Sequence, residues 1–232
     1  MSKQKELTVY KRDDMIQKSR LDLTLREQRL VLYAISKIKQ GDTVDTLYEL
    51  NIREIYNIVG AKDESYTRIK KIAQSLSDKS WWVILDDNSE SLVRWFSVFR
   101  IVPDTDTIRL KFHEDVMPFL FELLKQHKYY TSYGLSDVLP MRRQSSPRLY
   151  EILKSYSKNN SEWYFDLERI KYLLNCQHYD RWVDLKRRVI DPAMQEINEL
   201  TNMIVNYAPV TKGRKVIGVK FFMKDIRDSF LF

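Results

Sequence analysis

Glycine, proline and cysteine are scarce in this chain, and each shortage excludes a class of protein. With 5 Gly and 6 Pro among 232 residues, the sequence is neither collagen-like nor of low complexity. The single cysteine, Cys176, cannot form a disulfide within the chain, which favours a reducing cytosol. No apolar run approaches the roughly 18 residues of a membrane span, and the polar N-terminus lacks the apolar core of a signal peptide. We therefore expect a soluble, cytoplasmic protein with no membrane partner.

Patterns that indicate catalysis are also missing. The histidines, His113, His127 and His178, are scattered and show no paired spacing for a metal. There is no glycine-rich phosphate loop, so no motor ATPase is indicated. Rolling-circle initiators need a metal-binding histidine pair near a nucleophilic tyrosine, and none of the 14 tyrosines has such a neighbour. We therefore predict a protein that is not an enzyme, with no metal and no cofactor.

Positive charge is present in excess, and it is unevenly distributed. The net charge is +7, and residues 141–232 hold 17 Lys and Arg against 11 Asp and Glu. The first 140 residues hold 22 Lys and Arg against 21 Asp and Glu, so this half is nearly neutral. A basic second half points to a polyanionic partner for that half, although charge alone is equally consistent with a merely soluble basic protein.

The stretch from Tyr179 to Lys224 carries the clearest functional pattern. Apolar residues recur at helical spacing from Trp182 to Leu200, and two β-rich runs follow, Met203–Tyr207 and Val216–Met223. The cations lie off the apolar face of the helix (Arg181, Lys186, Arg187 and Arg188) and in the turn between the strands (Lys212, Arg214 and Lys215). Such a helix fits a major groove about 12 Å wide, while the hairpin tip can reach a phosphate. The pattern is typical of a winged helix-turn-helix that binds DNA.

A local sequence pattern in the first half of the chain recurs 115 residues later. Residues 48–55 (YELNIREI) align with residues 163–170 (WYFDLERI), and each copy is an aromatic strand, an Asx cap and an amphipathic helix. Each copy is preceded by a helix and followed by another helix and a hairpin, although chance matching of a common strand-cap-helix pattern is the alternative. We predict an α+β protein of two tandem winged-helix domains, residues 1–130 and 131–232.

Several further expectations concern single elements. We expect helices over residues 23–39 and 114–126 and a strand over residues 93–102, and we expect Asp166 to cap a helix. Pro192 should bend or interrupt the long helix of the second half, because it removes one backbone donor.

Other cations are weaker candidates for DNA contact. They are Arg68, Lys70 and Lys71 in the equivalent helix of the first half, and Arg142, Arg143 and Arg148 near the domain junction. The main alternative for the cations of the long helix is a solvated face paired with Asp180, Asp184 and Asp191.

Four motifs occur in a set order along nearly the whole chain. They are residues 25–30 (LREQRL), 146–153 (SPRLYEIL), 186–193 (KRRVIDPA) with 196–198 (EIN), and 212–216 (KGRKV). Together they resemble the initiator replication proteins of iteron-containing, theta-replicating plasmids. The resemblance implies binding to directly repeated sites in double-stranded DNA, opening of the origin and recruitment of host replication initiation and helicase-loading proteins. It also implies that the second domain makes the main sequence-specific contacts with DNA. The first domain would touch DNA lightly and form a homodimer, in equilibrium with the DNA-binding monomer, that represses its own gene.

Three other functions stay open at this point. One is a winged-helix transcriptional regulator without a replication role, from which tandem repeats of about 20 base pairs beside the gene would distinguish an initiator. The second is a nicking initiator of the rolling-circle type. The third is a protein-interaction module whose basic surface meets acidic partners, against which a steep salt dependence on duplex DNA would argue.

Overall fold

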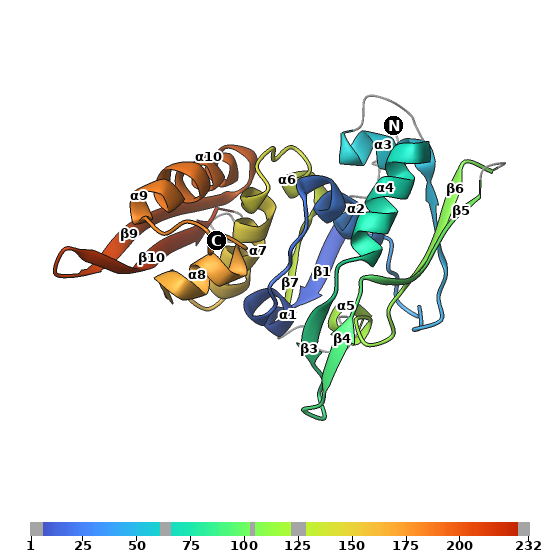
Figure 1. Ribbon diagram of the computed structural model, residues 1–232, viewed down its shortest axis with the longest axis horizontal. Coiled ribbons are helices and arrows are strands. Elements are labelled where there is room, and N and C mark those ends of the chain that lie inside the picture. Colours follow the sequence, from blue (N-terminus) through green and yellow to red (C-terminus); the bar gives the residue numbers. More distant parts are fainter. Residues whose placement is uncertain (1–6, 61–65, 103–104, 122–128, 227–232) are drawn as a thin grey trace. The chain divides into compact units, whose positions relative to one another are not determined.

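The computed structural model describes residues 7–60, 66–102, 105–121 and 129–226, which fall into two compact units (Figure 1). The first unit takes the residues up to Met15 together with Asp22–Leu139, and the second takes Ile16–Leu21 together with the residues from Pro140 onward. The chain thus divides after Leu139, whereas we expected a boundary at residue 130. The reason is that the strand Tyr130–Gly134 pairs with Thr8–Arg12 in the first unit.

Along its described residues the first unit contains six helices, the first of which it shares with the second unit, together with a three-stranded antiparallel sheet and two smaller two-stranded sheets. Its elements in order are β1 (Thr8–Arg12), α1 (Asp13–Lys18), α2 (Leu25–Ile35), β2 (Tyr48–Asn51), α3 (Ile52–Val59), α4 (Tyr66–Ser77), β3 (Trp81–Ile84), β4 (Glu90–Val93), β5 (Phe96–Val102), β6 (Thr107–Phe112), α5 (Pro118–Phe121), β7 (Tyr130–Gly134) and α6 (Leu135–Val138). The sheets have the orders β2-β6-β5, β3-β4 and β1-β7. Helix α1 begins in this unit and ends in the second.

The second unit repeats this plan in a shorter form. Its elements are α7 (Ser145–Ser157), β8 (Glu162–Asp166), α8 (Leu167–Leu173), α9 (Trp182–Leu185), the π-helical turn η4 (Lys186–Ile190), α10 (Asp191–Leu200), β9 (Met203–Lys212) and β10 (Lys215–Asp225). The antiparallel sheet has the order β8-β10-β9, and Figure 1 shows β9 and β10 as a long hairpin that extends past the helices of this unit. This sheet and the sheet β2-β6-β5 share one topology, in which the last strand lies between the first and the second. The chain therefore contains two winged-helix folds, as the internal repeat predicted.

Helix ends of the two units show the same repeat and one difference. The side chain of Asn51 accepts hydrogen bonds from the backbone N–H groups of Arg53 and Glu54 and caps α3. Gly60 and Asn175, which lie 115 residues apart, both have left-handed backbones after the repeated helix, with φ of 68° and 53°. Asp166 was expected to cap α8, but its side chain makes no capping hydrogen bond. Its carboxylate instead accepts a hydrogen bond from the Tyr164 hydroxyl at 2.9 Å.

Several element boundaries differ from those expected. Helix α2 is shorter than residues 23–39, because a capping box between Thr24 and Glu27 sets its start and Ser36 ends it. The expected strand over residues 93–102 is broken at Trp95, since β4 pairs with β3 whereas β5 pairs with β6. Residues 114–117 form turns before α5, and residues 122–126 of the expected helix lie outside the described residues.

The core of the second unit lies where α7, α8 and α10 pack on its sheet. The largest of its fully buried residues include Tyr150, Ile170, Ile197 and Phe221. Tyr150, Ile170 and Ile197 lie on α7, α8 and α10, and Phe221 lies on β10, so their burial packs these helices on the sheet. Among the helices that the structure describes, none is both long and apolar enough to cross a membrane.

Candidate nucleic-acid interface

The helix formed by α9, η4 and α10 presents charge on one side and apolar residues on the other. Leu185, Val189, Ala193 and Ile197 are buried against the core. The four cations of this helix that were predicted to contact DNA are all exposed: Arg181, Lys186, Arg187 and Arg188. Because burial of the apolar residues holds the helix in place, the cations are presented on a rigid element.

Proline sets the shape of this helix at the cations. Pro192 lacks an N–H group, so it cannot donate to the carbonyl of Arg188 four residues earlier. In its place the Asp191 N–H donates to the Lys186 carbonyl, five residues earlier, and Lys186–Ile190 form a π-helical turn. The expected interruption at Pro192 is therefore a widened turn, and the helix continues through it. Such turns are frequent at functional sites, and here the turn carries Lys186, Arg187 and Arg188.

Lys186 is bound to a carboxylate that also ties the helix to the hairpin. Its Nζ lies 2.7 Å from Asp191 Oδ2, and the Tyr207 hydroxyl of β9 donates to Asp191 Oδ1 at 2.5 Å. Burial would raise the pKa of Asp191, but the hydrogen bonds from Lys186 and Tyr207 hold it below its ordinary value. Burial and the bond to Asp191 raise the pKa of Tyr207 to about 12. This chain of contacts fixes the π-helical turn against the first strand of the hairpin.

Asp184 lies between two of the predicted arginines. Its carboxylate is 3.9 Å from Arg181 Nε and 3.6 Å from Arg187 Nη2, and both arginine side chains are more than two-thirds exposed. These contacts exceed hydrogen-bond length and are exposed, so each contributes about 0–1 kcal/mol. The alternative in which the helix cations pair with neighbouring carboxylates therefore holds in part. The pairs with Asp184 are weak enough that contacts to DNA could replace them.

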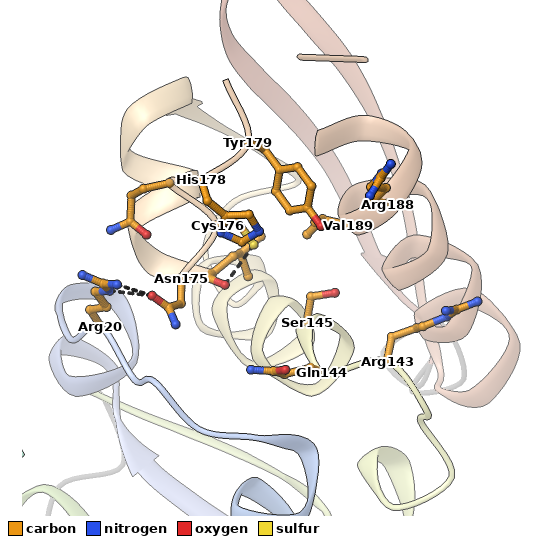
Figure 2. Close-up of a pocket in the computed structure, with 12 residues that line it drawn as sticks. Arg20, Arg143, Gln144, Ser145, Asn175, Cys176, His178, Tyr179, Arg188 and Val189 are labelled. Atoms are coloured by element: carbon orange, nitrogen blue, oxygen red, sulfur yellow. Dashed lines mark hydrogen bonds between the residues drawn. The ribbon is translucent and has the colours of Figure 1, made fainter. Parts of the chain in front are cut away.

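Arg188 differs from its neighbours. Within the described part of the chain no carboxylate lies within 4.0 Å of its guanidinium. It lines a hollow of about 500 Å³ together with Arg143 (Figure 2). The backbone N–H groups of Arg142 and Arg143 donate to the two carboxylate oxygens of Glu196 at 3.0 and 3.1 Å, while both arginine side chains are exposed. Glu196 thereby holds the Arg142–Arg143 connection against α10.

The hairpin tip concentrates cations without nearby carboxylates. The turn is tighter than expected, because β9 and β10 extend to Lys212 and Lys215 and leave Gly213 and Arg214 between them. Gly213 has φ of 63°, which suits a two-residue hairpin turn. Lys212 and Lys215 lie directly opposite each other, an arrangement that is destabilising without an anion. No ion pair of these three cations is found among the described residues.

Arg148 must be removed from the predicted contacts. It is 5% exposed, and its guanidinium donates to the carbonyls of Ile16 and Ser19 at 2.6 and 2.7 Å and lies 3.6 Å from Glu151. A buried guanidinium with these partners cannot reach a phosphate. Its role is to hold the segment Ile16–Leu21 against the second unit.

The candidates of the first unit lie on α4. Lys70 and Lys71 are exposed and Arg68 is half-buried, whereas Ile69, Ile72 and Leu76 face the core. Helix α4 thus presents its cations to solvent as the sequence predicted, but with fewer of them than the helix of the second unit.

Two family descriptions match the chain in the order of its two folds. Residues 8–154 match "Initiator Replication protein, WH1" and residues 166–223 match "Initiator Rep protein, WH2". The chain belongs to the initiator replication protein family. The first of these regions includes α7, which packs in the second unit and serves as the first helix of the second winged helix.

Individual proteins are also similar to this chain. A replication initiation protein of Escherichia coli is 25% identical over 214 residues, which are 85% of this chain and 64% of that protein. An uncharacterized 27.6 kDa protein of Escherichia coli is 25% identical over 115 residues, 47% of this chain and 45% of that protein. The chain thus spans less than two-thirds of the length of these relatives. The crystal structure of Pi initiator protein in complex with iteron DNA has the same fold, with a TM-score of 0.74 and 21% identity over 95% of this chain and 98% of that one.

Among the described residues of this member of the initiator family, no cluster of three or more His, Cys, Asp or Glu side chains is suited to a metal, and His127 lies outside them. Burial raises the pKa of the Cys176 thiol to about 11, so the thiol is protonated at neutral pH and is a poor nucleophile.

Two parts of this site were not predicted from the sequence. Arg20 lines the hollow beside Arg143 and Arg188, although it was not among the cations predicted to contact DNA. The Asp191–Tyr207 bond joins residues 16 apart, and no local spacing indicates it. Both depend on how distant segments pack.

Proposed function

We propose that this initiator binds directly repeated sites in double-stranded DNA at a plasmid replication origin and starts replication there. The observation that carries the proposal is the set of exposed cations on η4 and at the hairpin tip of one winged-helix unit. Family membership supports it, and so does the shared fold with a protein whose structure holds iteron DNA. Binding energy comes from counterion release and from contacts to base edges, with no chemistry on the DNA itself.

The second unit is the main reader in this proposal. Arg187 and Arg188, on the widened turn, are suited to bidentate contacts with guanine edges, and the tip cations are suited to phosphates. In the first unit, Lys70 and Lys71 of α4 make lighter contacts. Two winged helices that read successive major grooves of one duplex give a site of about 20 base pairs.

Footprinting on the DNA upstream of the protein's own gene tests this function. We expect protection of several direct repeats of about 20 base pairs, with a matched fragment of scrambled repeats as the control. A single protected operator without repeats would favour a transcriptional regulator. Incubation with supercoiled origin DNA and a divalent metal should leave the DNA uncut, and a nicked product would favour a rolling-circle initiator.

A homodimer through the first unit is the proposed second state of the protein. The hairpin of β3 and β4 exposes Trp82, Ile84 and Leu92, and Trp82 lies opposite Leu92. A two-stranded hairpin is marginally stable alone, and such an apolar surface is suited to burial against a second copy. The dimer would act as a repressor of the initiator gene. Trp82→Ser should shift sedimentation toward the monomer, and an unchanged dimer fraction would place the interface elsewhere.

We propose that the protein works in the cytoplasm with host replication initiation and helicase-loading proteins. Opening of the origin can be followed by permanganate reactivity of unpaired thymines in the presence and absence of the host initiator. Opening that is equally efficient without any host protein would contradict this part of the proposal.

A further inference from the structure

The hollow beside the π-helical turn extends beyond the proposed base and hairpin contacts and shares only Arg188 with them. It is lined by the first residues of α7, the turn after α8 and the side of η4 that carries Arg188 and Val189 (Figure 2). All of its lining residues belong to the second unit. It is therefore formed within one compact body, and its shape does not depend on the placement of the first unit.

The lining of this hollow has charge of one sign. Arg20, Arg143 and Arg188 contribute to it, and its twelve described lining residues include no aspartate or glutamate. This differs from the rest of the helix, where Asp184 and Asp191 accompany the neighbouring cations. Gln144 and Ser145 at the start of α7 add neutral polar groups. Three arginines that line one hollow, with no carboxylate among its described lining residues, are suited to an anion.

Arg20 reaches this hollow through contacts that are specific to the fold. The carbonyls of Ile16 and Ser19 accept hydrogen bonds from the buried Arg148, which fixes the segment that carries Arg20. The Arg20 guanidinium donates to the side-chain oxygen of Asn175 through Nε, at 2.8 Å, and through Nη2. Asn175 is itself held in the left-handed region after α8. No described residue accepts a bond from Nη1 of Arg20, so this nitrogen is available to a ligand.

The size of the hollow indicates whether it would hold a single anion or several. Its volume of about 500 Å³ is far larger than a single phosphate, and Figure 2 shows Arg20 at one end with Arg143 and Arg188 at the other. We propose that the hollow seats a stretch of DNA backbone, with successive phosphates of one strand bound along it. Because Arg188 belongs both to the hollow and to the helix that reads the groove, this strand flanks the groove that the helix enters. The inference rests on the proposed DNA binding and adds Arg20 as a phosphate-binding residue.

The salt dependence of binding to the repeat duplex tests this inference. The slope of log K against log salt concentration loses about 0.9 for each phosphate contact removed. Arg20→Gln and Arg143→Gln should each lower the magnitude of the slope by about one, and they should leave the preference for the repeat over scrambled DNA unchanged. Lys18→Gln is the matched control, because Lys18 is an exposed cation in the same segment and does not line the hollow.

Further variants separate charge from structure. Arg20→Lys keeps the charge but not the paired bonds to Asn175, so it should retain most of the wild-type slope. A wild-type slope for Arg20→Gln, or equal losses for Arg20→Gln and Arg20→Lys, would overturn the inference. Absence of repeat binding by the wild-type protein would instead overturn the proposed function, so the two failures are distinguishable.

A small phosphate compound is the other source of the same chemistry. Inorganic pyrophosphate is the probe, and the melting temperature of the DNA-free protein is the measurement. We expect no stabilisation at micromolar pyrophosphate, because the spread arginines match an extended strand. Stabilisation that Arg20→Gln abolishes, with an unchanged DNA slope, would assign the hollow to a small phosphate ligand and overturn the backbone assignment.

Discussion

The two winged-helix units share a topology but differ in where their carboxylates lie. In the first unit two cations of strand β6 have carboxylate partners: Arg109 Nε lies 2.6 Å from Glu49, and Lys111 Nζ lies 2.7 Å from Asp45. In the second unit, no described carboxylate pairs with the hairpin tip, at Lys212, Arg214 and Lys215. The wing of each unit is the hairpin β5–β6 or β9–β10. Wing cations that already have carboxylate partners gain little binding free energy from a phosphate, whereas unpaired wing cations gain the full contribution.

The reading helices differ in a related way. Helix α4 is a regular α-helix with two exposed cations on its first turns. The helix of the second unit has a π-helical turn beside Pro192, and three consecutive cations lie on that turn. In the proposed function one fold takes two roles, and the difference between them comes from a few side chains and one proline. Five experiments can break or sharpen this comparison.

The largest expected effect concerns stability. Arg148→Met removes the bonds to the Ile16 and Ser19 carbonyls and the ion pair with the buried Glu151, which should cost about 3–5 kcal/mol. Denaturant unfolding should show the loss in the second unit, with the first unit unchanged. Arg142→Met, a change at an exposed side chain nearby, should have little effect. Equal stability of the two variants would contradict the structural role of Arg148.

Removal of the cations on the reading helices should separate the units in binding. Arg187→Ala with Arg188→Ala should weaken specific binding by about 2–4 kcal/mol, because a bidentate base contact contributes about 1–3 kcal/mol. Lys70→Ala with Lys71→Ala should cost less than about 1 kcal/mol. Fluorescence anisotropy with the repeat duplex measures both. Equal losses would mean that the two units read DNA alike.

The two wings provide the third comparison. Replacement of Lys212, Arg214 and Lys215 by Gln should lower the magnitude of the salt slope by about 2–3. Replacement of Arg109 and Lys111 by Gln should change it by less than one, because their carboxylate partners already neutralise them. Titrations at several salt concentrations give both slopes, and a larger change in the first unit would reverse the proposed division.

Asp184→Asn tests whether a carboxylate restrains the second unit. An exposed ion pair contributes about 0.2–1 kcal/mol, so release of Arg181 and Arg187 should raise affinity for random duplex about two- to fivefold. Specificity for the repeat should fall accordingly. Competition with random DNA measures this ratio, and unchanged nonspecific affinity would mean that Asp184 does not restrain these arginines.

The smallest effect is expected from pH in the first unit. Glu27 is buried, which alone would raise its pKa, but hydrogen bonds from Lys79, Ser75 and Thr24 lower it below 4.5. Its contribution to stability is therefore present above pH 4.5 and is lost as pH falls through the lowered pKa. Glu27→Gln should cost about 1 kcal/mol at pH 7 and less near pH 3. A constant difference across this range would contradict the charged role of Glu27.

Much of the fold was predictable because its determinants are local. The cap at Asn51, the helix over Tyr66–Ser77 and the left-handed Gly60 follow from residue type and spacing. The break at Trp95 was not predictable, because it depends on a change of strand partner. The burial of Arg148 was also not predicted, because its partners Ile16 and Ser19 lie about 130 residues away in the sequence.

The sequence by itself determined that this chain has two similar α+β halves and an excess of positive charge in the second. These properties follow from periodicity and composition, which need no knowledge of distant contacts. Only the tertiary structure decided which cations face solvent, which are held by Asp184 and Asp191, and which meet around the hollow. Those outcomes depend on segments far apart in the chain that pack together, and local spacing does not specify such packing.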